Sequence, residues 1–141
     1  MNTLSSFHLA IPVNDIETTR RFYTEVLGCT VGREAKRWID FNFFGHQVSA
    51  HVKPDATDAM PTNPVDGENV PVRHFGLVLE WDTWHEFVEQ LNKKSVEYLI
   101  KPTTRFKGQA GEQATFFISD PSGNALEFKS FKDMSRLFSV R

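Results

Sequence analysis

The sequence is short of two features, and each shortage excludes a class of protein. It has one cysteine, Cys29, in 141 residues, so an intramolecular disulfide is excluded and a reducing compartment is expected. No apolar run approaches the roughly 20 residues of a membrane span, and the first residues lack a basic stretch followed by a long apolar core. We therefore expect a cytoplasmic protein without a membrane partner, in which Cys29 is a small buried residue rather than a nucleophile.

An excess of charge of either sign is also missing. The chain has 16 Lys and Arg against 18 Asp and Glu, a formal net charge of -2. Without an extended positive field, the protein is not expected to bind nucleic acid or anionic lipid. Its length suits one ordinary domain with a proper core. A small molecule is the expected partner.

A pattern of strand, helix and three strands occurs twice along the chain. In the first half, a strand at residues 7–13 precedes a helix that Asn14 is expected to cap and Gly28 to end. In the second half, a strand begins at His74 and precedes a helix with Thr83 as its expected cap. Period-2 runs predict the remaining strands at about 30–33, 37–44, 47–52, 96–100, 114–119 and 125–130.

The repeat predicts an α+β fold of two βαβββ modules, residues 1–53 and 73–131, within a single domain. Residues 54–72 are rich in proline, aspartate and asparagine, follow neither period, and are expected to be a linker. Residues 132–141 are expected to form a short helical tail. A module that cannot bury its own sheet face packs against its repeat or against a second chain, and a homodimer is expected. Pairing within one chain or by exchange across the dimer stays open.

Titratable side chains gather on the strand faces that also carry small residues. In the first strand, His8 lies with Ala10 on the side opposite Leu9 and Ile11. The same alternation separates His51, His74 and Glu127 from the bulky residues of their own strands. If the two modules curve into one mixed sheet around a central cavity, all four side chains converge on it.

Two imidazoles and one carboxylate form the facial ligand set of non-haem Fe(II) and related divalent ions. His8, His74 and Glu127 are therefore the predicted metal ligands, with Fe(II) as the expected ion and Mn, Ni or Zn as alternatives. Taken singly, each histidine also fits a hydrogen-bonded strand residue. Glu127 alone also fits a solvated carboxylate paired with Lys129.

Three stretches, FHLAIPVNDIETTRRFYTEVLG, RHFGLVLE and DPSGNALEFKSF, resemble the vicinal oxygen chelate superfamily. It includes glyoxalase I, extradiol ring-cleaving dioxygenases, fosfomycin-resistance thiol transferases and bleomycin-resistance proteins. RWIDFNFFGHQVSAHV and FKGQAGEQATFFISDPSGNALEFKSF are similar to its small predicted extradiol-type dioxygenases. The resemblance implies paired βαβββ modules in a U-shaped sheet that holds one metal ion. It maps the ligands onto His8, His74 and Glu127.

The expected strand at 47–52 departs from the glyoxalase pattern. Glyoxalase-like members often have a further glutamate or glutamine ligand in this strand, whereas this chain offers His51, with Ser49 and Gln47 on the same face, and no carboxylate. In extradiol enzymes a histidine of this region acts as acid and base. His51 is therefore the predicted catalytic residue, with a fourth metal ligand as its alternative role.

Three further residues are expected to contact a substrate. Arg105 and Lys107 lie in a glycine-containing segment, residues 103–113, and are predicted to bind an anionic group, although an ordinary solvated loop fits as well. Trp38 is predicted to line the cavity, although aromatic strand residues commonly serve packing. His46, in a turn, and His85, near a helix start, are assigned to no site.

The leading prediction is an Fe(II) extradiol-type dioxygenase that takes dioxygen and a small vicinal-diol or catechol-like substrate. A glyoxalase-like lyase or isomerase, or a thiol transferase, is the alternative, in which the metal acts as a Lewis acid. A non-enzymatic protein that binds a small molecule such as a drug is the third hypothesis.

Overall fold

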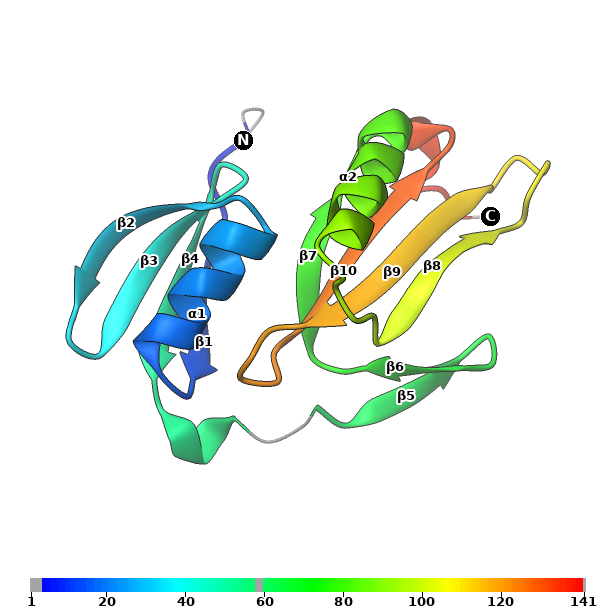
Figure 1. Ribbon diagram of the computed structural model, residues 1–141. Coiled ribbons are helices and arrows are strands. Elements are labelled where there is room, and N and C mark those ends of the chain that lie inside the picture. The colour runs from blue at the N-terminus through cyan, green and yellow to red at the C-terminus, as the bar shows by residue number, and fades with distance from the viewer. Residues whose placement is uncertain (1–3, 58–59, 141) are drawn as a thin grey trace. The chain divides into compact units, whose positions relative to one another are not determined.

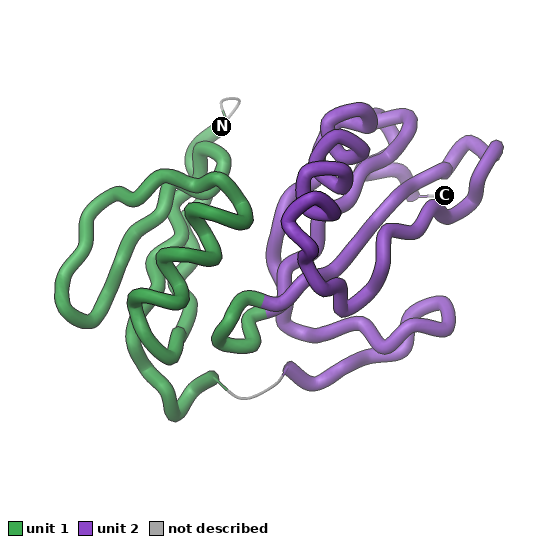
Figure 2. Tube along the Cα trace, in the orientation of Figure 1, with its two compact units in different colours: residues 1–59, 120–124 green, residues 60–119, 125–141 purple. Residues whose placement is uncertain are grey.

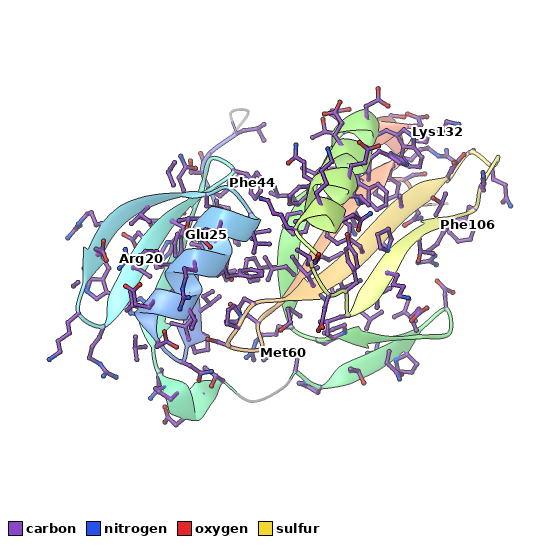
Figure 3. All side chains as sticks on the ribbon, viewed as in Figure 1. Arg20, Glu25, Phe44, Met60, Phe106 and Lys132 are labelled. Atoms are coloured by element: carbon purple, nitrogen blue, oxygen red, sulfur yellow. The ribbon has the colours of Figure 1, made fainter. Side chains whose placement is uncertain are left out.

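The computed structural model describes residues 4–57 and 60–140. The chain divides into two compact units, residues 1–59 with 120–124 and residues 60–119 with 125–141 (Figure 2). Each unit has its own four-stranded mixed sheet and its own helix (Figure 1). The α+β class and the repeated strand and helix order are therefore confirmed. No helix in the described ranges has the length and apolar character needed to cross a membrane.

The first unit has the strand order β1-β4-β3-β2, with α1 on one face of the sheet (Figure 1). The ring of Tyr23, just after α1, stacks on Phe41 with centroids 4.9 Å apart, and both side chains are fully buried. The polar strand face therefore lies on the side away from α1. The elements are β1 (His8–Val13), α1 (Ile16–Arg21), a π-helical turn (Phe22–Val26), β2 (Thr30–Ala35), β3 (Trp38–Phe43) and β4 (His46–Val52).

The second unit repeats this order as β7-β10-β9-β8, again with a helix on one face (Figure 1). Trp84 and Phe87 of the helix are buried against Phe116 and Phe128 of the sheet. Glu127 lies on the opposite face of this sheet, away from α2. The elements are β7 (His74–Val78), α2 (Trp81–Lys93), β8 (Ile100–Arg105), β9 (Gln113–Ser119) and β10 (Ala125–Phe131).

Both helices begin at residues other than those expected. Asp15, not Asn14, caps α1, and its carboxylate accepts a hydrogen bond from the amide of Thr18 at 2.9 Å. A carboxylate is favoured there because the first helical amides point towards it. α2 begins at Trp81, so Thr83 lies inside its first turn rather than before it.

The strand expected at 96–100 is wrong in position, because β8 runs from Ile100 to Arg105. Pro102 argues against a strand at this point, since it has no amide to donate. The fold accepts it because β8 is an edge strand whose pairing shifts register between Ile100 and Thr103. Arg105 is therefore the last residue of a strand and not part of a loop.

The segment 54–72, expected to be an irregular linker, contains regular structure. A 3-10 turn (Pro54–Ala56) is followed by a two-stranded hairpin of β5 (Thr62–Val65) and β6 (Glu68–Pro71). Asp66 and Gly67 join these strands with φ of 49° and 85°, as in a type I′ turn. In the tail, the expected helix is a single 3-10 turn, Met134–Arg136.

The turn at residues 120–124 belongs to the first unit through a buried network. The hydroxyl of Tyr23 donates to Asp120 at 2.9 Å, and the side-chain amide of Asn124 donates to Asp120 at 2.9 Å and to the carbonyl of Pro12 at 2.8 Å. Burial raises the pKa of the Asp120 carboxyl, although these hydrogen bonds oppose the rise. Burial, and then the charge of Asp120, raises the pKa of Tyr23 well above its usual value. The tyrosine therefore acts as a neutral donor.

Candidate metal and substrate site

His74 and Glu127 face each other on neighbouring strands of the second unit. His74 begins β7, and the parallel register of β7 and β10 places Glu127 opposite Gly76. The Nε2 atom of His74 lies 3.3 Å from Oε1 of Glu127. The structure thus brings together two of the three residues that the sequence predicts as metal ligands.

The outer atoms of both side chains are held by hydrogen bonds. Nδ1 of His74 lies 2.6 Å from the carbonyl oxygen of Pro71, and because a carbonyl only accepts, Nδ1 carries a proton. Oε2 of Glu127 accepts a hydrogen bond from the hydroxyl of Thr115 at 2.6 Å. The side chains of His74 and Glu127 are 30% and 16% exposed, so Glu127 is the better shielded of the two. These bonds fix the directions in which Nε2 and Oε1 point.

The two inner atoms fit a divalent ion. With the proton on Nδ1, a neutral imidazole presents the lone pair of Nε2 towards the carboxylate of Glu127. Two acceptors at 3.3 Å repel each other unless a positive charge, a proton on Nε2 or a metal ion, lies between them. Ligands about 2.1 Å from one ion and at right angles to each other lie about 3 Å apart. His74 and Glu127 can therefore occupy adjacent coordination positions.

This pair lies in the wall of a cavity of about 390 Å³ inside the second unit. The sheet face opposite α2 lines one part of it, and the hairpin of β5 and β6 lines another. The walls combine apolar side chains, among them Val70, Ile100 and Phe117, with the cations Arg105 and Lys129 and the carboxylates of Asp66, Glu68 and Glu127. A small molecule with an apolar body and polar ends is the kind of ligand that these walls suit.

Gly76 permits the close approach of β7 to β10 beneath this pair. A Cβ atom at this position would collide with the backbone carbonyl of Glu127. A residue with a side chain therefore cannot stand here without moving one of the two strands.

His8 and His51 lie in the first unit, on the sheet face opposite α1. In the strand register His8 is opposite Gln47, and His51 is opposite both Pro12 and Trp38. Both histidine side chains belong to exposed residues. The sequence-predicted ligand His8 and acid and base His51 therefore share one face.

Two other residues of this face have their own partners. The hydroxyl of Ser49, which is buried, donates to Asp40 at 2.6 Å. The ring of Trp38 has the guanidinium of Arg33 5.5 Å from its centroid. Gln47 on the same face of β4 also donates to Asp40, at 3.5 Å.

The remaining histidines, which the sequence assigned to no site, have hydrogen-bond partners of their own. Nδ1 of His46 accepts a hydrogen bond from the amide of Phe7 at 2.9 Å. Nδ1 of His85 lies 2.9 Å from the carbonyl of Trp81, to which it donates. His85 is therefore a suitable control for histidine substitutions.

Sequence reasoning did not find all the residues of this cavity. Arg105 lines it, whereas Lys107 is exposed in the following turn and does not. Thr115 and Lys129 were not predicted from the sequence. Each lies two residues from Phe117 or Glu127 in the same strand and therefore on the same sheet face. Within the ranges 4–57 and 60–140, no group of three His, Cys, Asp or Glu side chains forms a complete metal site.

Known proteins resemble this chain over nearly its whole length. Residues 5–128 match the model of the family described as Glyoxalase/Bleomycin resistance protein/Dioxygenase superfamily. A crystal structure of a glyoxalase/bleomycin resistance protein/dioxygenase from Alicyclobacillus acidocaldarius is 29% identical, with a TM-score of 0.79 over 98% of this chain and 100% of that one. A virulence protein of Salmonella typhimurium is 24% identical over 88% of this chain and 82% of its own length.

A more distant structure shows the fold alone. The fosfomycin resistance protein FosX of Listeria monocytogenes is 15% identical, with a TM-score of 0.69 over 97% of this chain and 99% of that one. Such a level of identity carries no information on which reaction is shared.

Proposed function

Because the chain belongs to the Glyoxalase/Bleomycin resistance protein/Dioxygenase superfamily, we propose that it is a metal-dependent enzyme that binds its substrate through two adjacent oxygen atoms. Many proteins of this superfamily are enzymes, and they generally use divalent metal ions. The observation that carries the proposal is the pairing of His74 and Glu127. Their inner atoms lie 3.3 Å apart, and their outer atoms are held by Pro71 and Thr115.

The proposed ligand set is His74, Glu127 and His8. The carbonyl of Pro71 and the hydroxyl of Thr115 keep two of these ligands oriented, so little is lost in ordering them when an ion binds. His8 remains a prediction from the sequence, and it comes from the same chain or from a partner in a homodimer. When bound, the ion lowers the pKa of coordinated hydroxyl groups and, if it is iron, supplies the redox chemistry that dioxygen requires.

The specific reaction that we propose is extradiol-type cleavage of a catechol-like substrate with Fe(II). Apolar side chains such as Phe117 and Ile100 line the cavity and can hold a flat ring. His51 is proposed to take the second phenolic proton and return it later, because an imidazole can both accept and donate a proton. The homodimer is likewise a proposal, which sedimentation equilibrium tests directly.

There are two alternatives, and the first depends on the role of His51. If it is a fourth ligand, it removes a coordination position that dioxygen chemistry needs, and a lyase, isomerase or thiol transferase is favoured. If the protein only binds a small molecule, the three proposed ligands have no role in turnover. Metal retention and turnover in His51→Ala distinguish the two roles of His51: retained metal with lost turnover indicates an acid and base, and lost metal indicates a ligand.

Metal stoichiometry tests the site. We expect about one divalent ion per chain in the purified protein, and its loss in His8→Ala, His74→Ala and Glu127→Ala. His85→Ala is the matched control and should retain the ion, because Nδ1 of its ring donates to the carbonyl of Trp81 in its own helix. Full occupancy in the three ligand variants would refute the assignment.

Oxygen uptake tests the reaction. After anaerobic loading with Fe(II), a panel of catechols should consume oxygen and give a coloured ring-cleavage product. Absence of oxygen consumption with every vicinal diol, together with turnover of a hemithioacetal or an epoxide, would move the assignment to the Lewis-acid reactions.

A further inference from the structure

The sheet face under the cavity provides a length scale for its ligand. Lys129 stands two residues beyond Glu127 on β10, and Phe131, two residues further, shares a row across β9 with Arg105. At about 3.4 Å per residue, Lys129 lies about 7 Å along the strand from Glu127. The row of Arg105 lies about 14 Å along the strand. His74 and Glu127 at one end are thus separated from Arg105 at the other, where the hairpin also adds the carboxylates of Asp66 and Glu68 to the lining.

The two cations differ in their present partners. Lys129 has no ion-pair partner within residues 4–57 and 60–140, whereas Arg105 pairs with Asp66 in the turn of the hairpin. The side chains of Arg105 and Asp66 are 30% and 61% exposed. An ion pair this open to water contributes little stability, so another carboxylate can replace Asp66 at small cost.

Apolar walls connect the two ends. Ile100 and Phe117 stand in the row of Glu127, and Val65 and Val70 line the cavity from the hairpin. A ligand body between the two ends therefore meets apolar surface, while its two polar ends meet the metal ligands and the cations.

We propose that the cavity selects a small anionic substrate: an apolar, ring-sized body with two adjacent oxygens at one end and a carboxylate or similar acid group at the other. Arg105 and Lys129 bind the acid group, and Asp66 holds Arg105 when no substrate is present. This proposal rests on the proposed function and adds the substrate class. It also replaces Lys107, which the sequence suggested, with Lys129 as the second cation.

A pair of matched ligands tests the proposal. 3-(3,4-Dihydroxyphenyl)propanoate and 4-propylcatechol share the ring and the chain length and differ in the carboxylate. Titration calorimetry on Zn(II)-loaded protein, which does not turn over, gives both dissociation constants. We expect the carboxylate ligand to bind at least tenfold more tightly.

Substitutions assign the effect to residues. Arg105→Met and Lys129→Met should each reduce the preference to below threefold, and Lys107→Met should leave it unchanged. Asp66→Asn should increase the preference, because Arg105 then has no competing carboxylate. Melting temperatures verify that each variant folds.

Each outcome bears on one proposal or the other. Equal affinity for the two ligands, or no binding of either, overturns the anionic substrate class. If the binding of 4-propylcatechol requires His74 but the carboxylate ligand binds no more tightly, the metal-dependent function is supported and the anionic substrate class is refuted. A preference that persists in metal-free protein and in His74→Ala supports the cationic site and refutes the role of the metal.

Discussion

At the scale of single residues, Thr115 fixes the orientation of the Glu127 carboxylate. Its hydroxyl occupies Oε2 and leaves Oε1 directed at His74. A carboxylate without this bond turns more freely and loses entropy when an ion binds. The metal site therefore depends on a residue that is not itself a ligand.

We predict that Thr115→Val weakens metal affinity about tenfold while leaving the stoichiometry at about one ion per chain. Competition with a chromophoric chelator measures the affinity. Thr103→Val is the matched control, because Thr103 lines the same cavity but donates its hydroxyl to the carbonyl of Lys101. Equal affinities in the two variants would contradict the role of Thr115.

Cys29 makes stability depend on pH at the alkaline end. Burial raises the pKa of its thiol from 9.0 to about 11. The folded protein therefore keeps this proton when the unfolded chain has lost it, so the associated stability is present below pH 9 and is lost as pH rises towards 11.

We predict that Cys29→Ala removes this part of the pH dependence, on the order of 2 kcal/mol between the two ends of the range. Urea unfolding at several values between pH 8 and 11 measures it. Tyr23, whose raised pKa acts in the same direction, is present in both proteins; burial and Asp120 are the larger causes of its shift and Cys29 a smaller one, so most of its contribution is common to the two. Parallel pH profiles for the two proteins would contradict the prediction.

At the scale of elements, the approach of β7 to β10 sets the positions of His74 and Glu127. Gly76→Ala places a Cβ against the carbonyl of Glu127, so the strands must separate. We predict a loss of about 3 kcal/mol in the free energy of unfolding, together with loss of the metal. Gly111→Ala, where a Cβ would meet no atom within 4 Å, should change stability by less than about 0.5 kcal/mol. Similar losses in both variants, by chemical denaturation, would contradict this account.

The repeated strand and helix pattern was predictable because periods of 2 and 3.6 residues are visible in the sequence. β5 and β6 were missed because Pro64 and Pro71 argue against strands, and an isolated two-stranded hairpin tolerates them. The Asp66–Gly67 dipeptide was the signal that indicates this hairpin. Pro102 argued against a strand in the same way, so the strand was expected at 96–100 rather than at Ile100–Arg105.

The site was predictable in part for a related reason. Strand alternation placed His74 and Glu127 on the polar face, and this needs no knowledge of neighbours. Thr115 and Lys129 acquire their roles from the register between β9 and β10, which alternation within one strand does not reveal.

At the scale of the whole molecule, the first unit is discontinuous in sequence. Residues 1–59 need the turn 120–124, since Asp120 accepts the buried hydroxyl of Tyr23 and Asn124 donates to the carbonyl of Pro12. Without that turn a buried hydroxyl loses its acceptor, which costs about 1 to 3 kcal/mol. The continuous segment of the first unit is therefore not self-sufficient.

We predict that a fragment of residues 1–59 does not fold cooperatively, as circular dichroism and amide exchange would show. The full chain with Tyr23→Phe is the control. It should remain folded and lose only about 1 kcal/mol, because the rest of the network still pairs Asp120 with Asn124. A cooperative transition in the fragment would contradict the dependence on the turn.

The discontinuity also sets an order of events during synthesis. A ribosome that adds about 5 to 20 residues per second needs roughly 3 to 12 seconds to pass from residue 59 to residue 120. Throughout that interval the nascent first unit exists without Asp120, and Tyr23 has no acceptor from the turn. The part of the protein that is made first is therefore completed only when the penultimate strand has been translated.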